Sequence, residues 1–126
     1  MTTPDGLRYS PEHEWVRVEG DRAVVGITDY AQDALGDVVY VQLPDVGLNV
    51  VAHTSIAEIE STKSVSEVYC PLTGTVVETN GELDDRPEAI NEDAYGQGWI
   101  FTIELADPAE LDGLMDAAAY EAFLAG

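Results

Sequence analysis

The sequence predicts a mainly β protein, built as a small antiparallel sandwich or barrel, with a short helix near residues 28–35 and a helical C-terminus. Short stretches of alternating apolar and polar residues fill the middle of the chain. Glycine, proline, asparagine and aspartate separate these stretches, as in turns between strands. The 126 residues, 45% of them hydrophobic, suffice for one core, because two half-size domains would each bury too little apolar surface. We therefore expect a single domain.

The clearest strand is predicted over residues 99–105, where apolar residues alternate with others to give one strongly apolar face. A second strand is predicted over residues 38–43, with Val39 and Val41 on one face, and it stops at Pro44. Residues 80–98 are expected to form a polar loop. Shorter strands are expected at residues 13–18, 22–27, 55–60, 65–70 and 75–78.

Two helical regions are predicted from their capping residues. Thr28 is a suitable N-cap for a helix of about two turns, and Gly36 can end that helix in the left-handed conformation. Near the C-terminus Asp107 is a suitable N-cap, and Glu110 can complete a capping box. Two runs of apolar residues at helical spacing follow, so the tail is either two short helices or one broken helix.

The charge of the chain excludes several functions. Its 25 acidic and 5 basic residues give a formal charge of −20, so nucleic acid and anionic membranes would repel it.

The chain lacks both an apolar run of the roughly 20 residues that a bilayer span needs and a signal-peptide pattern at its start, so we expect a cytoplasmic protein. The single cysteine, Cys70, and two histidines make a disulfide framework or a metal site unexpected.

Lysine is almost absent, because four of the five basic residues are arginines and Lys63 is the single lysine. Together with the excess of carboxylates, this composition favours life in concentrated salt, where the Debye length falls to roughly 3 Å and repulsion is screened. An ordinary acidic, very soluble protein is the alternative. Unchanged folding in low salt would exclude the halophilic interpretation.

Residues 60–64 lie between two predicted strands and are expected to form the tip of a β-hairpin. If Ile59 and Val68 point inward, Lys63 lies near the turn and is exposed. An exposed lysine is most often a solvated charge. However, arginine would be solvated equally well at this position. That the chain keeps its single lysine here indicates a need for the lysine amine, which can be acylated, whereas guanidinium cannot. Covalent modification of Lys63 is therefore the sharper hypothesis.

Seven short motifs cover most of the chain in a fixed order: HEWV at 13–16, GITDYAQ at 26–32, LGDVV at 35–39, LP at 43–44, ESTKS at 60–64, NED at 91–93 and YGQGW at 95–99. In this order they resemble the H-protein family of the glycine cleavage system. Each motif alone is weak, but the ordered set is specific.

The resemblance implies a lipoyl/biotinyl-type β-sandwich, also called a barrel-sandwich hybrid. It implies a single lipoyl-carrier domain over residues 1–126, with an N-terminal strand extension and a C-terminal helical extension. Lys63 would carry lipoic acid in amide linkage, and the protein would be a carrier and not an enzyme. Cleft residues carried over from the family are Glu12, Glu14 and Glu67, which would hold the loaded aminomethyl arm by charge-assisted hydrogen bonds. Alternatively, these acids are merely solvated.

The resemblance also implies partners. The P protein (glycine decarboxylase, with pyridoxal phosphate) would supply the aminomethyl group of glycine. The T protein (aminomethyltransferase) would pass its methylene to tetrahydrofolate, and the L protein (dihydrolipoamide dehydrogenase) would reoxidise the lipoyl dithiol. A lipoate ligase or lipoyl synthase would modify Lys63, and we expect a monomer.

Three alternatives remain open from the sequence. A biotin carrier typically has methionines beside its lysine, whereas Thr62 and Ser64 flank Lys63 here. A lipoyl domain of a 2-oxoacid dehydrogenase complex usually has an Asp-Lys-Ala turn and belongs to a longer chain. In an unmodified acidic binding module, Lys63 would be only a surface charge. Intact mass distinguishes a lipoyl amide, a biotinyl amide and no addition.

Overall fold

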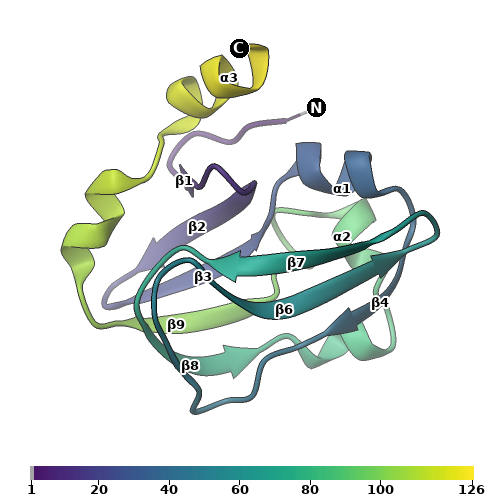
Figure 1. The fold of residues 1–126 in the computed structure, drawn as a ribbon, viewed down its shortest axis with the longest axis horizontal. Helices are drawn as coiled ribbons and strands as arrows, with labels where there is room; N and C mark the ends of the chain where they lie inside the picture. The colour runs from purple at the N-terminus through teal and green to yellow at the C-terminus, as the bar shows by residue number, and fades with distance from the viewer. Residues whose placement is uncertain (1) are drawn as a thin grey trace.

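The computed structural model describes residues 2–126, which form two antiparallel β-sheets, short helices at one edge and a helical C-terminus (Figure 1). The smaller sheet has three strands in the order β4 (Val38–Gln42), β6 (Thr54–Ser61) and β7 (Val65–Cys70). The larger sheet has six strands in the order β1 (Arg8–Tyr9), β2 (Glu14–Glu19), β3 (Arg22–Ile27), β9 (Phe101–Leu105), β8 (Gly74–Thr79) and β5 (Asn49–Val50).

The main apolar core contains buried side chains from both sheets, so the sheets pack face to face as a sandwich. Ile59 of β6 and Val68 of β7 are buried as expected, with relative exposures of 0% and 1%. The inward set of the larger sheet includes Val25, Val76 and Ile103. This confirms the predicted mainly β class.

The predicted strands 22–27 and 65–70 are confirmed at both ends, and the other strands are confirmed with small shifts. The strand predicted to start at residue 99 begins at Phe101, because Trp99 closes the preceding turn by donating its N–H to Gly96 O at 3.1 Å. The expected inward face of β4 is confirmed at Val41, which is 1% exposed, but is wrong at Val39. A bulge between Val38 and Tyr40 leaves Val39 53% exposed and turns Val38 inward instead.

The helix predicted near residues 28–35 is present as α1 (Asp29–Leu35). The hydroxyl of Thr28 accepts a hydrogen bond from Ala31 N–H at 3.2 Å, which confirms the N-cap. Gly36 ends the helix with φ 82° and ψ −156°. Its φ is positive as expected, but its ψ is extended, so the left-handed helical conformation is wrong.

The C-terminal region forms two short helices, η2 (Pro108–Gly113) and α3 (Ala117–Ala125). The Asp107 side chain caps η2 as predicted, accepting from Ala109 N–H at 3.2 Å. The capping box is wrong, because the Glu110 carboxylate accepts instead from the N–H and hydroxyl of Thr73 at 2.7 and 2.9 Å. The loop expected at 80–98 contains two short helices, η1 (Gly81–Asp84) and α2 (Ala89–Glu92).

Helix α3 packs against the N-terminal segment, at the top of Figure 1. The rings of Tyr9 and Tyr120 are stacked with centroids 4.7 Å apart. Tyr9 N–H also donates to Met115 O at 2.8 Å, which fastens β1 to the chain just before α3. Within residues 2–126, every helix is too short or too polar to cross a bilayer.

Candidate functional site

Lys63 lies exposed in the turn between β6 and β7, as the hairpin interpretation predicted. The turn is closed by Ser61, whose hydroxyl oxygen accepts from the N–H groups of Lys63 and Ser64 at 3.2 and 3.1 Å. Ser61 N–H also donates to Ser64 O at 2.8 Å. A serine at this position therefore fixes the backbone from which the lysine projects. The amine is accessible to an acylating enzyme while its anchor is held.

The hairpin tip is also joined to the segment between α1 and β4. Thr62 N–H donates to Asp37 O at 3.0 Å, and Ser61 pairs with Val38 in the β4–β6 ladder. These contacts attach the lysine turn to a neighbouring part of the fold. Lys63 consequently has a defined place relative to α1.

Beside this segment lies a cleft of about 190 Å³. It is formed by the turn before β2 and the first residue of β2, by β3, by α1, and by β6 and β7. The three carboxylates predicted to share a cleft all line it. Its lining residues are Glu12, His13, Glu14, Ile27, Tyr30, Ala31, Ala34, Leu35, Ile59, Ser66 and Glu67.

Glu14 is the buried acid of the cleft, with a relative exposure of 1%. The Ser10 hydroxyl donates to its Oε1 at 2.6 Å and accepts from the Glu14 N–H at 3.1 Å. Burial raises the pKa of Glu14 from 4.5 to about 7, and hydrogen bonds from Ser10 and the Tyr69 backbone act in the opposite direction. Near neutral pH this carboxyl group is thus divided between its neutral and charged forms.

The other two carboxylates lie at the surface. Glu12 Oε1 is 3.9 Å from Nδ1 of His53, and Glu67 accepts from the Tyr69 hydroxyl at 2.9 Å. Both residues are exposed. The cleft therefore has one buried acid and two exposed acids at its mouth.

His13 completes this side of the cleft and has a positive φ of 71°, which is uncommon for a residue other than glycine. Its Nδ1 lies 2.8 Å from the hydroxyl of Tyr120 in α3. Burial lowers the pKa of His13 below its ordinary value of 6.5, against the opposing effect of Glu12. The imidazole is accordingly held towards its neutral form beside the carboxylates.

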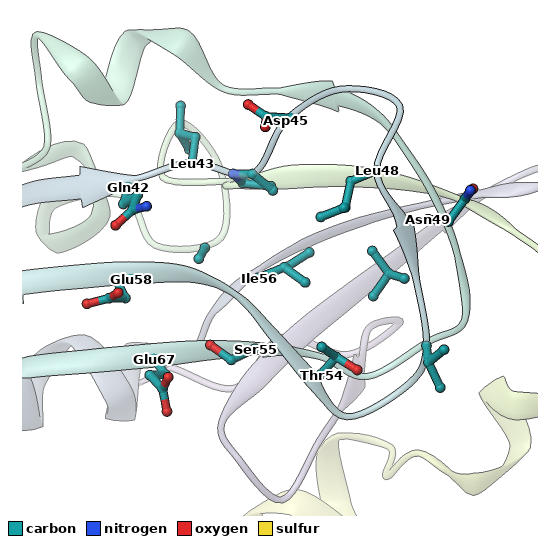
Figure 2. Close-up of a pocket in the computed structure, with 14 residues that line it drawn as sticks. Gln42, Leu43, Asp45, Leu48, Asn49, Thr54, Ser55, Ile56, Glu58 and Glu67 are labelled. Atoms are coloured by element: carbon teal, nitrogen blue, oxygen red, sulfur yellow. The ribbon is translucent and has the colours of Figure 1, made fainter.

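A larger groove of about 640 Å³ lies between residues 42–51 and strands β6 and β7 (Figure 2). Glu58 and Glu67 lie along one side of it, and Gln42, Leu43 and Asp45 lie along the other. None of the side chains that line this groove is a lysine, histidine or cysteine. The smaller cleft contains the buried acid and includes Leu35, Ile59 and Ser66 from the segments that lead to Gly36 and the lysine turn, and it is the candidate site.

Sequence reasoning missed Ser10, the hydrogen-bond partner of Glu14. The Ser10-Pro11 pair favours a turn, and that turn returns the serine hydroxyl to Glu14. No sequence signal placed the face of α1 that carries Ala31 and Ala34 against β6 and β7.

Two packed sheets with an exposed lysine at a hairpin turn define a carrier domain of the lipoyl/biotinyl type. The model of the glycine cleavage H-protein family matches residues 7–126. The H protein of Symbiobacterium thermophilum is 57% identical over 95% of this chain and 94% of its own length. The H protein of Anaeromyxobacter sp. strain K is 57% identical over 98% and 97%.

A solved structure of the H protein from Mycobacterium marinum has a TM-score of 0.89 and 39% identity, and it covers 98% of this chain and 99% of its own. The chain belongs to the glycine cleavage H-protein family. Members of this family are lipoate carriers, components of the glycine cleavage system that are not themselves catalysts. The fold is accordingly the lipoyl-type barrel-sandwich.

Proposed function

We propose that Lys63 carries lipoic acid in amide linkage and that residues 1–126 act as a single lipoyl-carrier domain. The β1 strand is its N-terminal extension, and η2 with α3 is its C-terminal extension. The observation that supports this most strongly is the position of Lys63. The single lysine of the chain projects from a turn that Ser61 closes with its hydroxyl.

The residues near Lys63 fit a lipoyl arm. The amine is exposed, and the adjoining cleft has apolar walls from Ile27, Leu35 and Ile59, which suit a hydrocarbon chain. The carboxylates of the cleft suit an amine carried at the end of that chain. When attached, lipoic acid supplies the disulfide that accepts the aminomethyl group of glycine.

The cleft residues have distinct roles in this proposal. Glu14, when ionised, accepts a charge-assisted hydrogen bond from the protonated amine of the cargo. Glu12 and Glu67 add negative charge at the mouth. The apolar walls exclude water from the cargo, and the neutral His13 adds no positive charge that would repel it.

The partners of the proposal are the P protein (glycine decarboxylase), the T protein (aminomethyltransferase) and the L protein (dihydrolipoamide dehydrogenase). A lipoate ligase or lipoyl synthase attaches the cofactor. A flexible arm on a fixed hairpin gives its cargo a high effective concentration at whichever enzyme is docked. We propose that the protein acts as a cytoplasmic monomer, and its family favours this function over the biotin carrier, the dehydrogenase lipoyl domain and the unmodified module.

The direct test compares the lipoylated wild type with Lys63→Arg in a reconstituted system of P, T and L proteins, with release of CO2 from glycine as the readout. Lys63→Arg keeps the charge at an exposed turn, so we expect the variant to fold normally and to support no turnover. Circular dichroism checks the fold. Turnover by Lys63→Arg at the wild-type rate would contradict the proposal.

A further inference from the structure

The side chain of Lys63 does not simply extend into solvent but lies across Gly36. A methyl group on Gly36 would be 3.1 Å from Lys63 Cε and 3.7 Å from both Cδ and Nζ. The first distance is tighter than ordinary van der Waals contact. The lysine stem therefore occupies space that a Cβ at position 36 would need.

The backbone of Gly36 also requires glycine. Its φ of 82° and ψ of −156° fall in a region that other residues essentially never adopt. Gly36 N–H donates to Gln32 O at 3.1 Å, which closes the last turn of α1. This conformation ends α1. Because Gly36 has no side chain, the lysine stem can lie close to its backbone.

Asn91 in α2 binds the same segment through three hydrogen bonds. Its Nδ2 donates to Gly36 O at 2.9 Å, and its Oδ1 accepts from Val38 N–H at 2.8 Å. A third hydrogen bond, from Nδ2 to Gln32 Oε1, is 2.9 Å long. These bonds give the NED motif at residues 91–93 a structural purpose, because one side chain fixes both ends of the Gly36 turn.

The residues that precede Gly36 at the end of α1 belong to the cleft. Ala34 and Leu35, which immediately precede Gly36, both line the cleft. The lysine stem therefore lies on a residue that directly follows two residues of the cleft lining. Acylation changes only the end of the side chain and leaves Cδ and Cε unaltered, so the same contact is available to the modified lysine.

We propose that Gly36 is a positioning residue that directs the Lys63 arm along α1 into the cleft, with Asn91 holding Gly36 in place. This inference rests on the proposed function. It adds that the contact between the Lys63 stem and Gly36 favours positions of the arm in the cleft. This effect does not depend on contacts made by the loaded end of the arm.

The first experiment tests the contact in the unmodified full-length protein. Because the chain contains one lysine, lysine-selective isotope labelling gives NMR signals from Lys63 alone. We expect nuclear Overhauser effects between the Hε protons of Lys63 and the Hα protons of Gly36. Their absence in the wild type would overturn the proposal, whether or not the protein is ever lipoylated.

The second experiment measures the release of ammonia from aminomethyl-loaded protein without T protein, and intact mass confirms lipoylation of each variant. Gly20→Ala is the control for Gly36→Ala, since Gly20 also has a positive φ, of 66°, but has open space around it. We expect release to be about tenfold faster in Gly36→Ala and unchanged in Gly20→Ala.

A second pair of variants leaves the Gly36 backbone intact. Ala34→Leu adds bulk to the exposed cleft-lining position on α1 without disfavouring the helix, and Asp33→Leu places the same side chain one residue away, outside the cleft lining. Ala34→Leu should speed release and Asp33→Leu should not. Equal release from Ala34→Leu, Asp33→Leu and the wild type would overturn the inference and leave the carrier function standing. A wild type that is never lipoylated would instead refute the proposed function.

Discussion

Nδ1 of His13, on the cleft, lies 2.8 Å from the hydroxyl of Tyr120 near the end of the chain. The same hydroxyl lies 2.8 Å from Oγ1 of Thr28, the N-cap of α1. One residue of α3 therefore joins the turn that carries His13 to the N-cap of α1, and residues of both segments line the cleft. The C-terminal extension is thus part of the structure that shapes the site.

Removing this hydroxyl should loosen the cleft. We expect Tyr120→Phe to lower the free energy of unfolding by about 1–2 kcal/mol, because it leaves partners of a largely buried network without a hydrogen bond. Urea unfolding measures the change. Tyr40→Phe, at a half-exposed position on β4, is the matched control and should stay within about 0.5 kcal/mol of the wild type. Equal losses in the two variants would contradict the role given to Tyr120.

The buried Glu14 should make stability depend on pH. Its pKa is about 7 in the folded protein against an ordinary value of 4.5, so between these values the folded state holds a proton that the unfolded state has lost. The contribution of Glu14 to the free energy of unfolding therefore falls as pH rises from about 4.5 to 7. Above about pH 7 this contribution no longer changes.

Glu14→Gln removes the loss of stability that accompanies ionisation of Glu14, because glutamine does not ionise. We expect the variant to be more stable than the wild type by about 1–3 kcal/mol at pH 8, and to show little gain at pH 4.5. Urea unfolding at the two pH values is the measurement. Glu78→Gln removes the same charge from an exposed site on β8 and should show no comparable gain. A Glu14→Gln variant that is destabilised equally at both pH values would refute the assignment.

The same titration should govern retention of the cargo. An amine stays protonated near neutral pH, whereas Glu14 becomes charged only as pH rises through about 7. We therefore expect loaded wild-type protein to release ammonia more slowly at pH 8 than at pH 6. Glu14→Gln should remove most of this dependence. An unchanged pH profile in the variant would show that Glu14 does not hold the amine.

The excess of negative charge should make folding depend on salt. With 25 acidic residues against 5 basic ones, repulsion outweighs the few ion pairs, such as Arg17–Glu19 and Arg86–Glu92. Raising NaCl from about 0.1 M to 1 M shortens the Debye length from about 10 to 3 Å, so the thermal midpoint should rise. A midpoint that is constant or falls would exclude the halophilic interpretation.

The sequence predicted the features that depend on local pattern. Neighbouring residues determine the alternation in β7, the cap at Thr28 and the exposed turn at Lys63. The resemblance added the grouping of Glu12, Glu14 and Glu67, which now lie around one cleft.

Features set by distant contacts could not be predicted in this way. The bulge in β4 depends on its pairing with β6, and it exchanges the buried and exposed valines. Glu110 bonds to Thr73 across the fold instead of completing a local capping box. The contact between Lys63 and Gly36 likewise arises only when the hairpin meets the end of α1.

Attachment of lipoic acid to Lys63 is the central claim, and the intact mass of the protein from its own cells tests it most directly. We predict the mass of the polypeptide plus one lipoyl amide, with the added mass on the fragment that contains Lys63. Lys63→Arg from the same cells should have the mass of the bare chain. A wild-type protein that shows only the polypeptide mass, or a biotinyl addition, would contradict the account.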